Sequence, residues 1–225
     1  VEDTAVPPAN LPAFVADFQQ VLEDHDTSAS FYAHAGPGVL HIRPLVNTKT
    51  DSGVATMESI ADAVTDLVVE YGGSVSGEHG DGRARTQWNR KLYGDDLWAT
   101  FRALKSAFDP EWLLNPGNIC GDHSTTEHLR FDPDYEFDAG FDPKLNWDTD
   151  NGFEGMAELC HGCGGCRGPQ ETTGGVMCPT YRAAEEEIQS TRGRANMLRQ
   201  AMSGDLDDEP FDDEFVEEVL DLCIG

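Results

Sequence analysis

Two glycine-rich segments carry histidines and a glutamate at spacings that suit a divalent metal site. Residues 31–44 read FYAHAGPGVLHIRP, and residues 72–82 read GGSVSGEHGDG. His34, His41 and Glu78 lie near glycines, which leave room for a ligand to approach the backbone. Two imidazoles and one carboxylate, with an open position for substrate, are a common ligand set of catalytic divalent ions. We expect these three residues to bind zinc, manganese or iron.

Two neighbouring side chains extend this set. His79 follows Glu78 directly and is left free to act as a general base near neutral pH. Arg43 stands two residues beyond His41, on the same face of a predicted strand, and could bind a substrate carboxylate through two parallel hydrogen bonds. Both have plain alternatives, because histidines beside glycines are commonly structural and a surface ion pair explains Arg43 equally well.

Three cysteines in the last third of the chain have the spacing of iron–sulfur ligands. Cys160, Cys163 and Cys166 form a C-x2-C-x2-C run, and Cys178 is followed by proline. This is the bacterial ferredoxin pattern with a longer segment before its last cysteine. The fourth cysteine of that pattern ligates the other cluster, so we expect Cys178 and Cys223 to share a second four-iron, four-sulfur cluster. The remaining ligands would come from cysteines beyond this sequence.

A structural zinc site is the alternative for the run, with the ligands Cys160, Cys163, Cys166 and Cys178. Cys120 lies outside the run and is expected to be a packed or free thiol. Six cysteines in 225 residues, four of them in this pattern, favour metal over disulfides and a reducing, cytoplasmic compartment. No stretch approaches the roughly 20 apolar residues of a membrane helix, although peripheral association with a membrane stays compatible with the sequence.

The composition predicts a folded and very acidic protein. Lys+Arg 15 against Asp+Glu 42 gives a net charge of −27, and 39% hydrophobic residues supply a core for one large or two modest domains. Acid spread this evenly is typical of halophilic proteins, whose charge repulsion is screened by salt. An acidic protein from an ordinary environment is the alternative. The lack of a basic stripe argues against nucleic acid as a partner.

Apolar periodicity predicts an α+β fold, with helices packed on an antiparallel sheet. Residues 38–46 alternate as a strand, and residues 74–76 read as a second, short one. The expected helices cover residues 11–22, 57–71, 97–108, 195–202 and 215–222. The expected domains are a substrate-side domain at 1–120, a linker rich in Asp-Pro pairs at 121–151, and a mostly helical, ferredoxin-like iron–sulfur segment at 152–225.

Three ordered motifs make the first part of the chain resemble the C-terminal half of the FAD-linked oxidases of the vanillyl-alcohol-oxidase superfamily. They are FYAHAGPGVLHIRP, GGSVSGEHGDGRAR and FDPEWLLNPGNI. That group includes D-lactate dehydrogenases, the glycolate oxidase flavin subunit and D-2-hydroxyglutarate dehydrogenases. The cysteine segment with TYRAAEEEIQSTRGRANMLR resembles the iron–sulfur subunit of glycolate oxidase. Having both on one chain is similar to long fused dehydrogenases, so we expect a piece of such a protein.

The resemblance implies roles for individual residues. His34 and His41 match the two metal-binding histidines, Glu78 the metal-binding carboxylate and His79 the general base. Asn115, in the Asn-Pro-Gly signature, matches a residue close to the flavin.

The chain also departs from the family pattern. Pro37 and Val39 replace the Asp and Asn usual between the two histidines, and Arg43 stands where many relatives have Asn. These departures leave the identity of the substrate open.

The implied activity is that of a flavin-dependent 2-hydroxy-acid dehydrogenase of the D-lactate, glycolate or D-2-hydroxyglutarate type. Electrons would pass from FAD through the clusters to a quinone or another electron carrier. FAD would be held mostly by an N-terminal domain absent from this sequence, so we expect the chain alone to be inactive. The alternative is a non-catalytic module that binds zinc or a partner. A pure electron-transfer subunit would leave the histidine and glutamate motifs unexplained.

Overall fold

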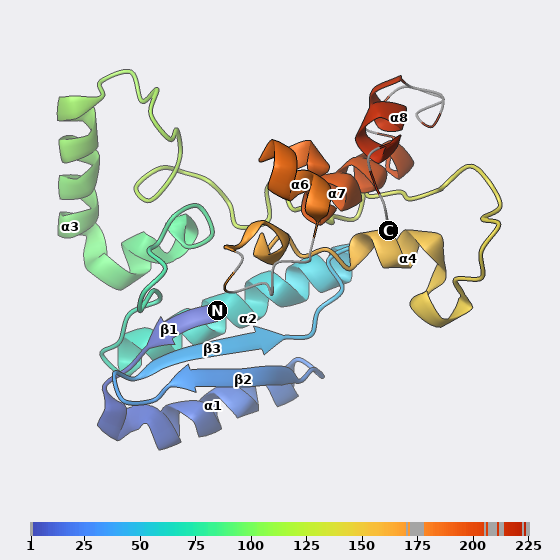
Figure 1. Cartoon of the computed structure of the whole chain (residues 1–225). Helices are drawn as coiled ribbons and strands as arrows, with labels where there is room; N and C mark the ends of the chain where they lie inside the picture. Colours follow the sequence, from blue (N-terminus) through green and yellow to red (C-terminus); the bar gives the residue numbers. More distant parts are fainter. Residues whose placement is uncertain are drawn as a thin grey trace. The chain divides into compact units, whose positions relative to one another are not determined.

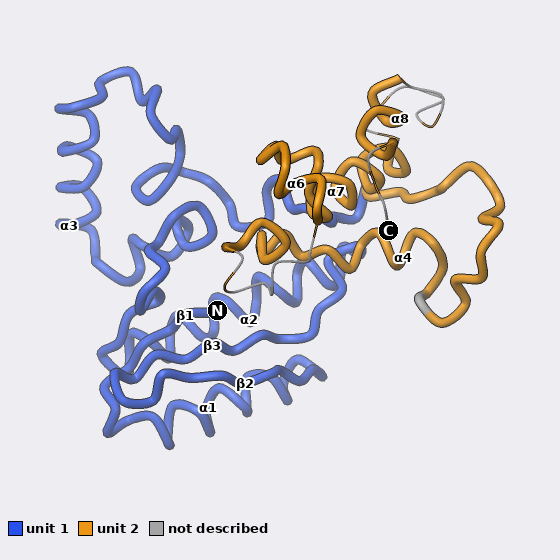
Figure 2. The backbone as a smooth tube through the Cα atoms, viewed as in Figure 1, with its two compact units in different colours: residues 1–134 blue, residues 135–225 orange. Residues whose placement is uncertain are grey.

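The structure is a computed structural model that describes residues 2–169, 171, 178–204, 206, 211, 214–221 and 223, without the side chain of residue 150. These residues form two compact units, residues 1–134 and residues 135–225 (Figure 2). The division falls inside the segment predicted as a linker, and the predicted limits at residues 120 and 152 stay predictions. None of the helices in the described part of the chain has both the length and the apolar character needed to span a membrane.

Unit 1 is built on a three-stranded antiparallel sheet in the order β1-β3-β2 (Figure 1). The strands are β1 (Glu2–Ala5), β2 (Ala29–His34) and β3 (Val39–Pro44). β2 and β3 form a hairpin, paired from Ala29 opposite Pro44 to His34 opposite Val39. The predicted strand at 38–46 is therefore confirmed as β3, the central strand. The sequence patterns did not reveal β1 and β2.

Helices α1 (Leu11–Asp24) and α2 (Asp51–Glu70) build the core of unit 1 with the sheet. Phe14, Phe18 and Val64 from these helices pack in one cluster with Leu40 and Ile42 of β3. Alternation along a strand directs neighbouring side chains to opposite faces, so Val39 and His41 belong to the other face. The core thus occupies one side of the sheet and leaves the other side for the site.

The loop between α2 and α3 (Thr86–Phe108) lies against part of that second face, at Val39 and His41. An added Cβ at Gly77 would come within 2.9 Å of Val39, so the glycine allows the loop to lie directly on the sheet. The predicted strand at 74–76 is wrong, because only Ser74 pairs, through an isolated bridge to Ala5. α3 also begins earlier than predicted and is kinked at Gly94, where φ is 78°.

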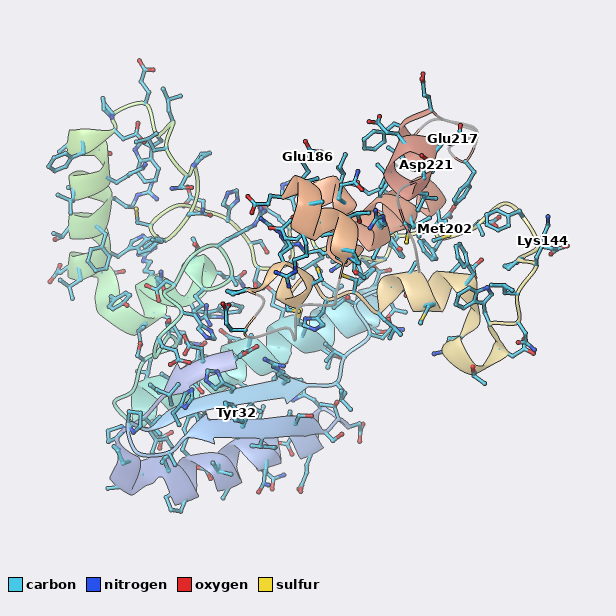
Figure 3. The ribbon with its side chains drawn as sticks, in the orientation of Figure 1. Tyr32, Lys144, Glu186, Met202, Glu217 and Asp221 are labelled. Atoms are coloured by element: carbon cyan, nitrogen blue, oxygen red, sulfur yellow. The ribbon has the colours of Figure 1, made fainter. Side chains whose placement is uncertain are left out.

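Unit 2 is mostly helical in its described residues, as predicted, while its ferredoxin-like character stays a prediction. Residues 121–147, all described, contain no helix or strand. α7 (Thr191–Met202) and α8 (Glu214–Asp221) confirm the two predicted helices, although Leu222 lies outside the described residues. Met202, labelled in Figure 3, packs with Ala139 and Ala157, and Met197 packs with α8. The other elements are η1 (Pro8–Asn10) in unit 1, and η2 (Asp148–Asp150), α4 (Gly152–Glu158), η3 (Gly165–Arg167), α6 (Pro179–Ala184) and η4 (Glu187–Gln189) in unit 2.

Candidate functional site

Three histidines converge on one glutamate on the sheet face opposite the core. His34 ends β2, His41 lies in β3, and Glu78 and His79 lie in the loop before α3. The Nε2 atoms of His34, His41 and His79 lie 3.5, 3.1 and 3.5 Å from Glu78 Oε1. The structure therefore brings together all four residues that the two glycine-rich motifs singled out.

His41 is the fixed centre of this cluster. Its side chain is only 6% exposed, whereas those of His34, Glu78 and His79 are 44%, 43% and 49% exposed. The His41 ring is stacked with Tyr32 at 5.6 Å and 27° and with His79 at 5.3 Å and 26°. Tyr32, labelled in Figure 3, lies on β2, and the strand register pairs it with His41 of β3. One imidazole is thus held rigidly, and three partly exposed groups surround it.

Glu2 of β1 lies behind His41 and was not identified from the sequence. His41 Nδ1 is buried without a hydrogen-bond partner, and Glu2 Oε1 lies 3.7 Å away. Arg43 donates to both oxygens of Glu2, from Nη2 at 3.0 Å and from Nε at 3.3 Å. The hydrogen bond from Arg43 lowers the pKa of Glu2, against an increase from burial. Arg43 therefore lies beside the cluster with its donors directed to Glu2, and its binding of a substrate carboxylate stays a prediction.

Asp3 of β1 lies beneath the Glu78–His79 loop and was also missed. Its side chain is fully buried. It accepts hydrogen bonds from Ser76 Oγ at 2.8 Å, Glu78 N at 3.0 Å and His79 N at 2.9 Å. Burial raises the pKa of Asp3, but these hydrogen bonds outweigh burial and hold it below its usual value. Asp3 is therefore ionised at neutral pH and lies under the loop as a negative charge.

The residues of the cluster fit a divalent cation. Asp3, His41, Glu78 and His79 each offer one ligand atom within 4.8 Å of the others. His34 Nε2 adds a further imidazole nitrogen, 3.5 Å from Glu78 Oε1. Imidazole nitrogens with one carboxylate suit zinc, manganese or iron. The position of Glu2 behind His41 Nδ1 also suits a metal site, because ligating histidines commonly donate their other ring N–H to a carboxylate.

The Asn-Pro-Gly turn is attached to the first part of α3. Asn115 is exposed and has a φ of 45°. Ile119 N donates to Thr86 Oγ1 at 2.7 Å, and Asn89 Nδ2 donates to Ile119 O at 2.9 Å. These contacts fix the segment that follows Asn115, while its place beside a flavin stays a prediction.

In the C-x2-C-x2-C run of unit 2, Cys160 and Cys163 lie in a stretch without regular secondary structure, and Cys166 lies in η3. Cys163 Sγ accepts a hydrogen bond from Gly165 N at 3.4 Å. The pKa of Arg192 is raised chiefly by its hydrogen bond to Glu187, and the nearby Cys160 and Cys166 add to this. Hydrogen bonds to sulfur and a nearby positive charge are features of iron–sulfur ligation.

Cys178 and Cys223 line the same apolar cavity of unit 2, of about 580 Å³. Cys178 Sγ accepts a hydrogen bond from Thr191 N at 2.9 Å, and its own φ is 51°. Among the described residues, no three cysteines bring their sulfurs within 4.8 Å of one another. Two thiolates on one zinc ion lie within about 4.6 Å, twice the Zn–S bond, so the described thiols are not preassembled for zinc. Cys120 is buried in unit 1.

Comparison with known proteins matches residues 1–119 to the FAD linked oxidases, C-terminal domain. D-2-hydroxyglutarate dehydrogenase of Haemophilus influenzae is 34% identical over 200 residues, 89% of this chain and 19% of the relative. The same enzyme of Escherichia coli is 34% identical over 208 residues, 88% of this chain and 19% of the relative. Glycolate oxidase subunit GlcD of Escherichia coli is 35% identical over 126 residues, 56% of this chain and 25% of the relative.

The chain spans about a fifth of the length of these D-2-hydroxyglutarate dehydrogenases. A match with 89% of the chain is too long for residues 1–134 and must extend into unit 2, where the cysteine run lies. The family match covers more than half of the chain. It includes the histidine–glutamate cluster, which consists of His34, His41, Glu78 and His79. The chain therefore belongs to the FAD-linked oxidases, with residues 1–119 in the C-terminal domain of that family.

Proposed function

We propose that this chain is part of a flavin-dependent 2-hydroxy-acid dehydrogenase, comprising its substrate-side domain and the start of its iron–sulfur region. The convergence of three imidazole nitrogens on Glu78 Oε1 carries the proposal. Relatives named for D-2-hydroxyglutarate and for glycolate support the substrate class, because both compounds are 2-hydroxy acids.

In this proposal His34, His41 and Glu78 hold a divalent ion, which when bound polarises the substrate hydroxyl. His79 removes the hydroxyl proton at Nε2. Its Nδ1 lies 3.8 Å from the buried Asp3 carboxylate, and its Nε2 lies 3.5 Å from Glu78 Oε1. Arg43 is proposed to orient the acid, with Glu2 holding its guanidinium near His41.

FAD, held mainly by polypeptide outside this sequence, would accept the hydride from C2 of the acid. Asn115 is proposed to lie against the flavin. Large apolar side chains near the Asn115 turn support the packing of another part of the protein against it. Phe108, Leu113 and Leu114 are 85%, 71% and 68% exposed. Apolar surface of this kind commonly marks an interface.

Iron–sulfur clusters would take electrons from the flavin one at a time and pass them to a quinone or another carrier. Cys160, Cys163 and Cys166 are the proposed ligands of the first cluster, and Cys178 and Cys223 contribute to the second. The hydrogen bonds to Cys163 and Cys178 and the shared cavity of Cys178 and Cys223 support this assignment. The D-2-hydroxyglutarate dehydrogenase of Haemophilus influenzae matches 89% of this chain, which supports a protein that carries both units on one polypeptide.

The decisive variant is His79→Ala in the full-length protein. Loss of a general base should lower kcat by about 10²–10⁴-fold, while flavin absorbance and bound metal stay as in the unaltered protein. His128→Ala is the matched control, because His128 is an exposed histidine of the same unit. Unchanged turnover in His79→Ala would contradict the base assignment and favour a non-catalytic module.

A further inference from the structure

One buried side chain, that of Asp3, binds the peptide groups of both Glu78 and His79. Asp3 accepts hydrogen bonds from the backbone N–H groups of both residues, at 3.0 and 2.9 Å. Its backbone carbonyl accepts a third bond, from Gly77 N at 2.7 Å. Because consecutive peptide groups are fixed in this way, the directions in which the two side chains leave the loop are fixed as well.

A β-bulge places the Asp3 carboxylate under the loop. Glu2 pairs with His41 and Thr4 pairs with Leu40, so Asp3 is an extra residue between two adjacent positions of β3. A bulge redirects a side chain away from its regular place on the pleat. Asp3 has a φ of 78°, a conformation that aspartate tolerates better than most residues and that persists where the surroundings enforce it.

An oxygen of Asp3 lies close enough to the ligand atoms of His41, Glu78 and His79 to share a metal ion with them. Both Asp3 oxygens, however, already accept hydrogen bonds. Oδ2 accepts from Ser76 Oγ and His79 N, and Oδ1 accepts from Glu78 N. A carboxylate has about four acceptor positions, so little capacity remains for a cation. Its contacts therefore favour a supporting role over direct metal ligation.

We propose that Asp3 is a positioning residue that sets the divalent-metal affinity of the histidine–glutamate cluster by fixing the loop peptides of Glu78 and His79. The inference rests on the proposed function in one respect, namely that the cluster binds a divalent ion.

The test is Asp3→Asn in this chain, with Co²⁺ as the probe and its visible absorption and binding heat as readouts. Asparagine keeps the shape but replaces one acceptor oxygen with a donor that faces the loop N–H groups. Supporting groups of metal sites contribute about 10–100-fold in metal affinity, and we expect a loss of that size. Asp26→Asn is the matched control, an exposed aspartate of unit 1 with a φ of 51°, and should bind Co²⁺ as the unaltered chain does.

A purely structural role would lower the melting temperature without changing Co²⁺ affinity or spectrum in the folded fraction, and that result overturns the inference. If Asp3→Asn does not fold, Ser76→Ala decides, because it removes one donor to Asp3 and leaves the backbone intact. Unchanged affinity in Ser76→Ala then overturns the inference, and a weaker site supports it. Failure of the unaltered chain to bind Co²⁺ overturns both this inference and the proposed metal site, whereas equal binding by the Asp3 variant overturns only the former.

Discussion

The two units present their candidate ligands in different ways. In unit 1, His34 of β2 and His41 of β3 lie 3.5 and 3.1 Å from the carboxylate of Glu78, which comes from a loop. In unit 2, three of the cysteines follow one another between α4 and the end of η3, and no three of the described thiols lie within 4.8 Å of one another. One candidate ligand set is brought together from separate elements of the fold, whereas most of the other comes from a single short segment of the chain.

Packing explains the difference. The site of unit 1 lies on a sheet whose other face is covered by a continuous core that includes Phe14, Phe18 and Ile42. Among the described residues of unit 2, the buried clusters are smaller and centre on Met197 and Met202 of α7. Where burial supplies less stability, cofactor binding supplies more of it, because ligands without a preformed site convert binding free energy into folding free energy. The stability of unit 2 should therefore depend on the proposed iron–sulfur clusters more strongly than the stability of unit 1 depends on the proposed metal.

The largest effect is expected from removing the cysteine run. In the full-length protein, Cys160→Ser with Cys163→Ser and Cys166→Ser should lose about four irons and four sulfides per chain. Amide hydrogen exchange should then accelerate in unit 2 and stay unchanged in β3. Cys120→Ser, a buried cysteine outside the run, should keep its full iron and sulfide content. Zinc without sulfide in the unaltered protein would contradict the iron–sulfur assignment.

A smaller effect is expected from metal at the histidine–glutamate cluster. Unit 1 should be folded without metal, and Zn²⁺ at a hundred times its Kd should add about 2.7 kcal/mol to its unfolding free energy. His41→Ala should abolish this gain, since it removes the central nitrogen. His25→Ala is a suitable control, because His25 bonds to Val21 and Ser59 outside the cluster. Rapid exchange of the β3 amide hydrogens in the absence of metal, with protection only after metal is added, would show that unit 1 also needs its ion to fold. The proposed difference between the two units would then be wrong.

Much of the site follows from the sequence, because its four central residues lie in two short motifs. The glycines and histidines of those motifs predict an accessible metal site, and the structure brings the four side chains to one carboxylate oxygen. The helical periodicity likewise predicts α1, α2 and α7, each of which buries one apolar face. These features are local and repeat at a fixed spacing, so no knowledge of distant contacts is needed.

The missed parts depend on distant contacts. β2 is exposed along nearly its whole length, so its sequence lacks the alternation that marks a half-buried strand. β1 has only four residues and contains a bulge, which disrupts any alternation. The roles of Glu2 and Asp3 follow from the register of β1 against β3, and nothing near them in the sequence specifies that register.

The smallest expected effect concerns the Glu2–Arg43 pair and depends on pH. The pKa of Glu2 is lowered by its hydrogen bond from Arg43, so the pair stabilises the fold above the unfolded glutamate value of about 4.3 and stops doing so as pH falls through the lower, folded value. Glu2→Gln should therefore cost up to about 1 kcal/mol at pH 7, as expected for a partly exposed ion pair. At a pH below both values the variant and the unaltered chain should be equally stable in urea unfolding. Glu23→Gln, an exposed glutamate on α1, is the control and should differ little at either pH. An equal penalty for Glu2→Gln at both pH values would show that packing of the side chain, and not its charge, holds Arg43 beside His41.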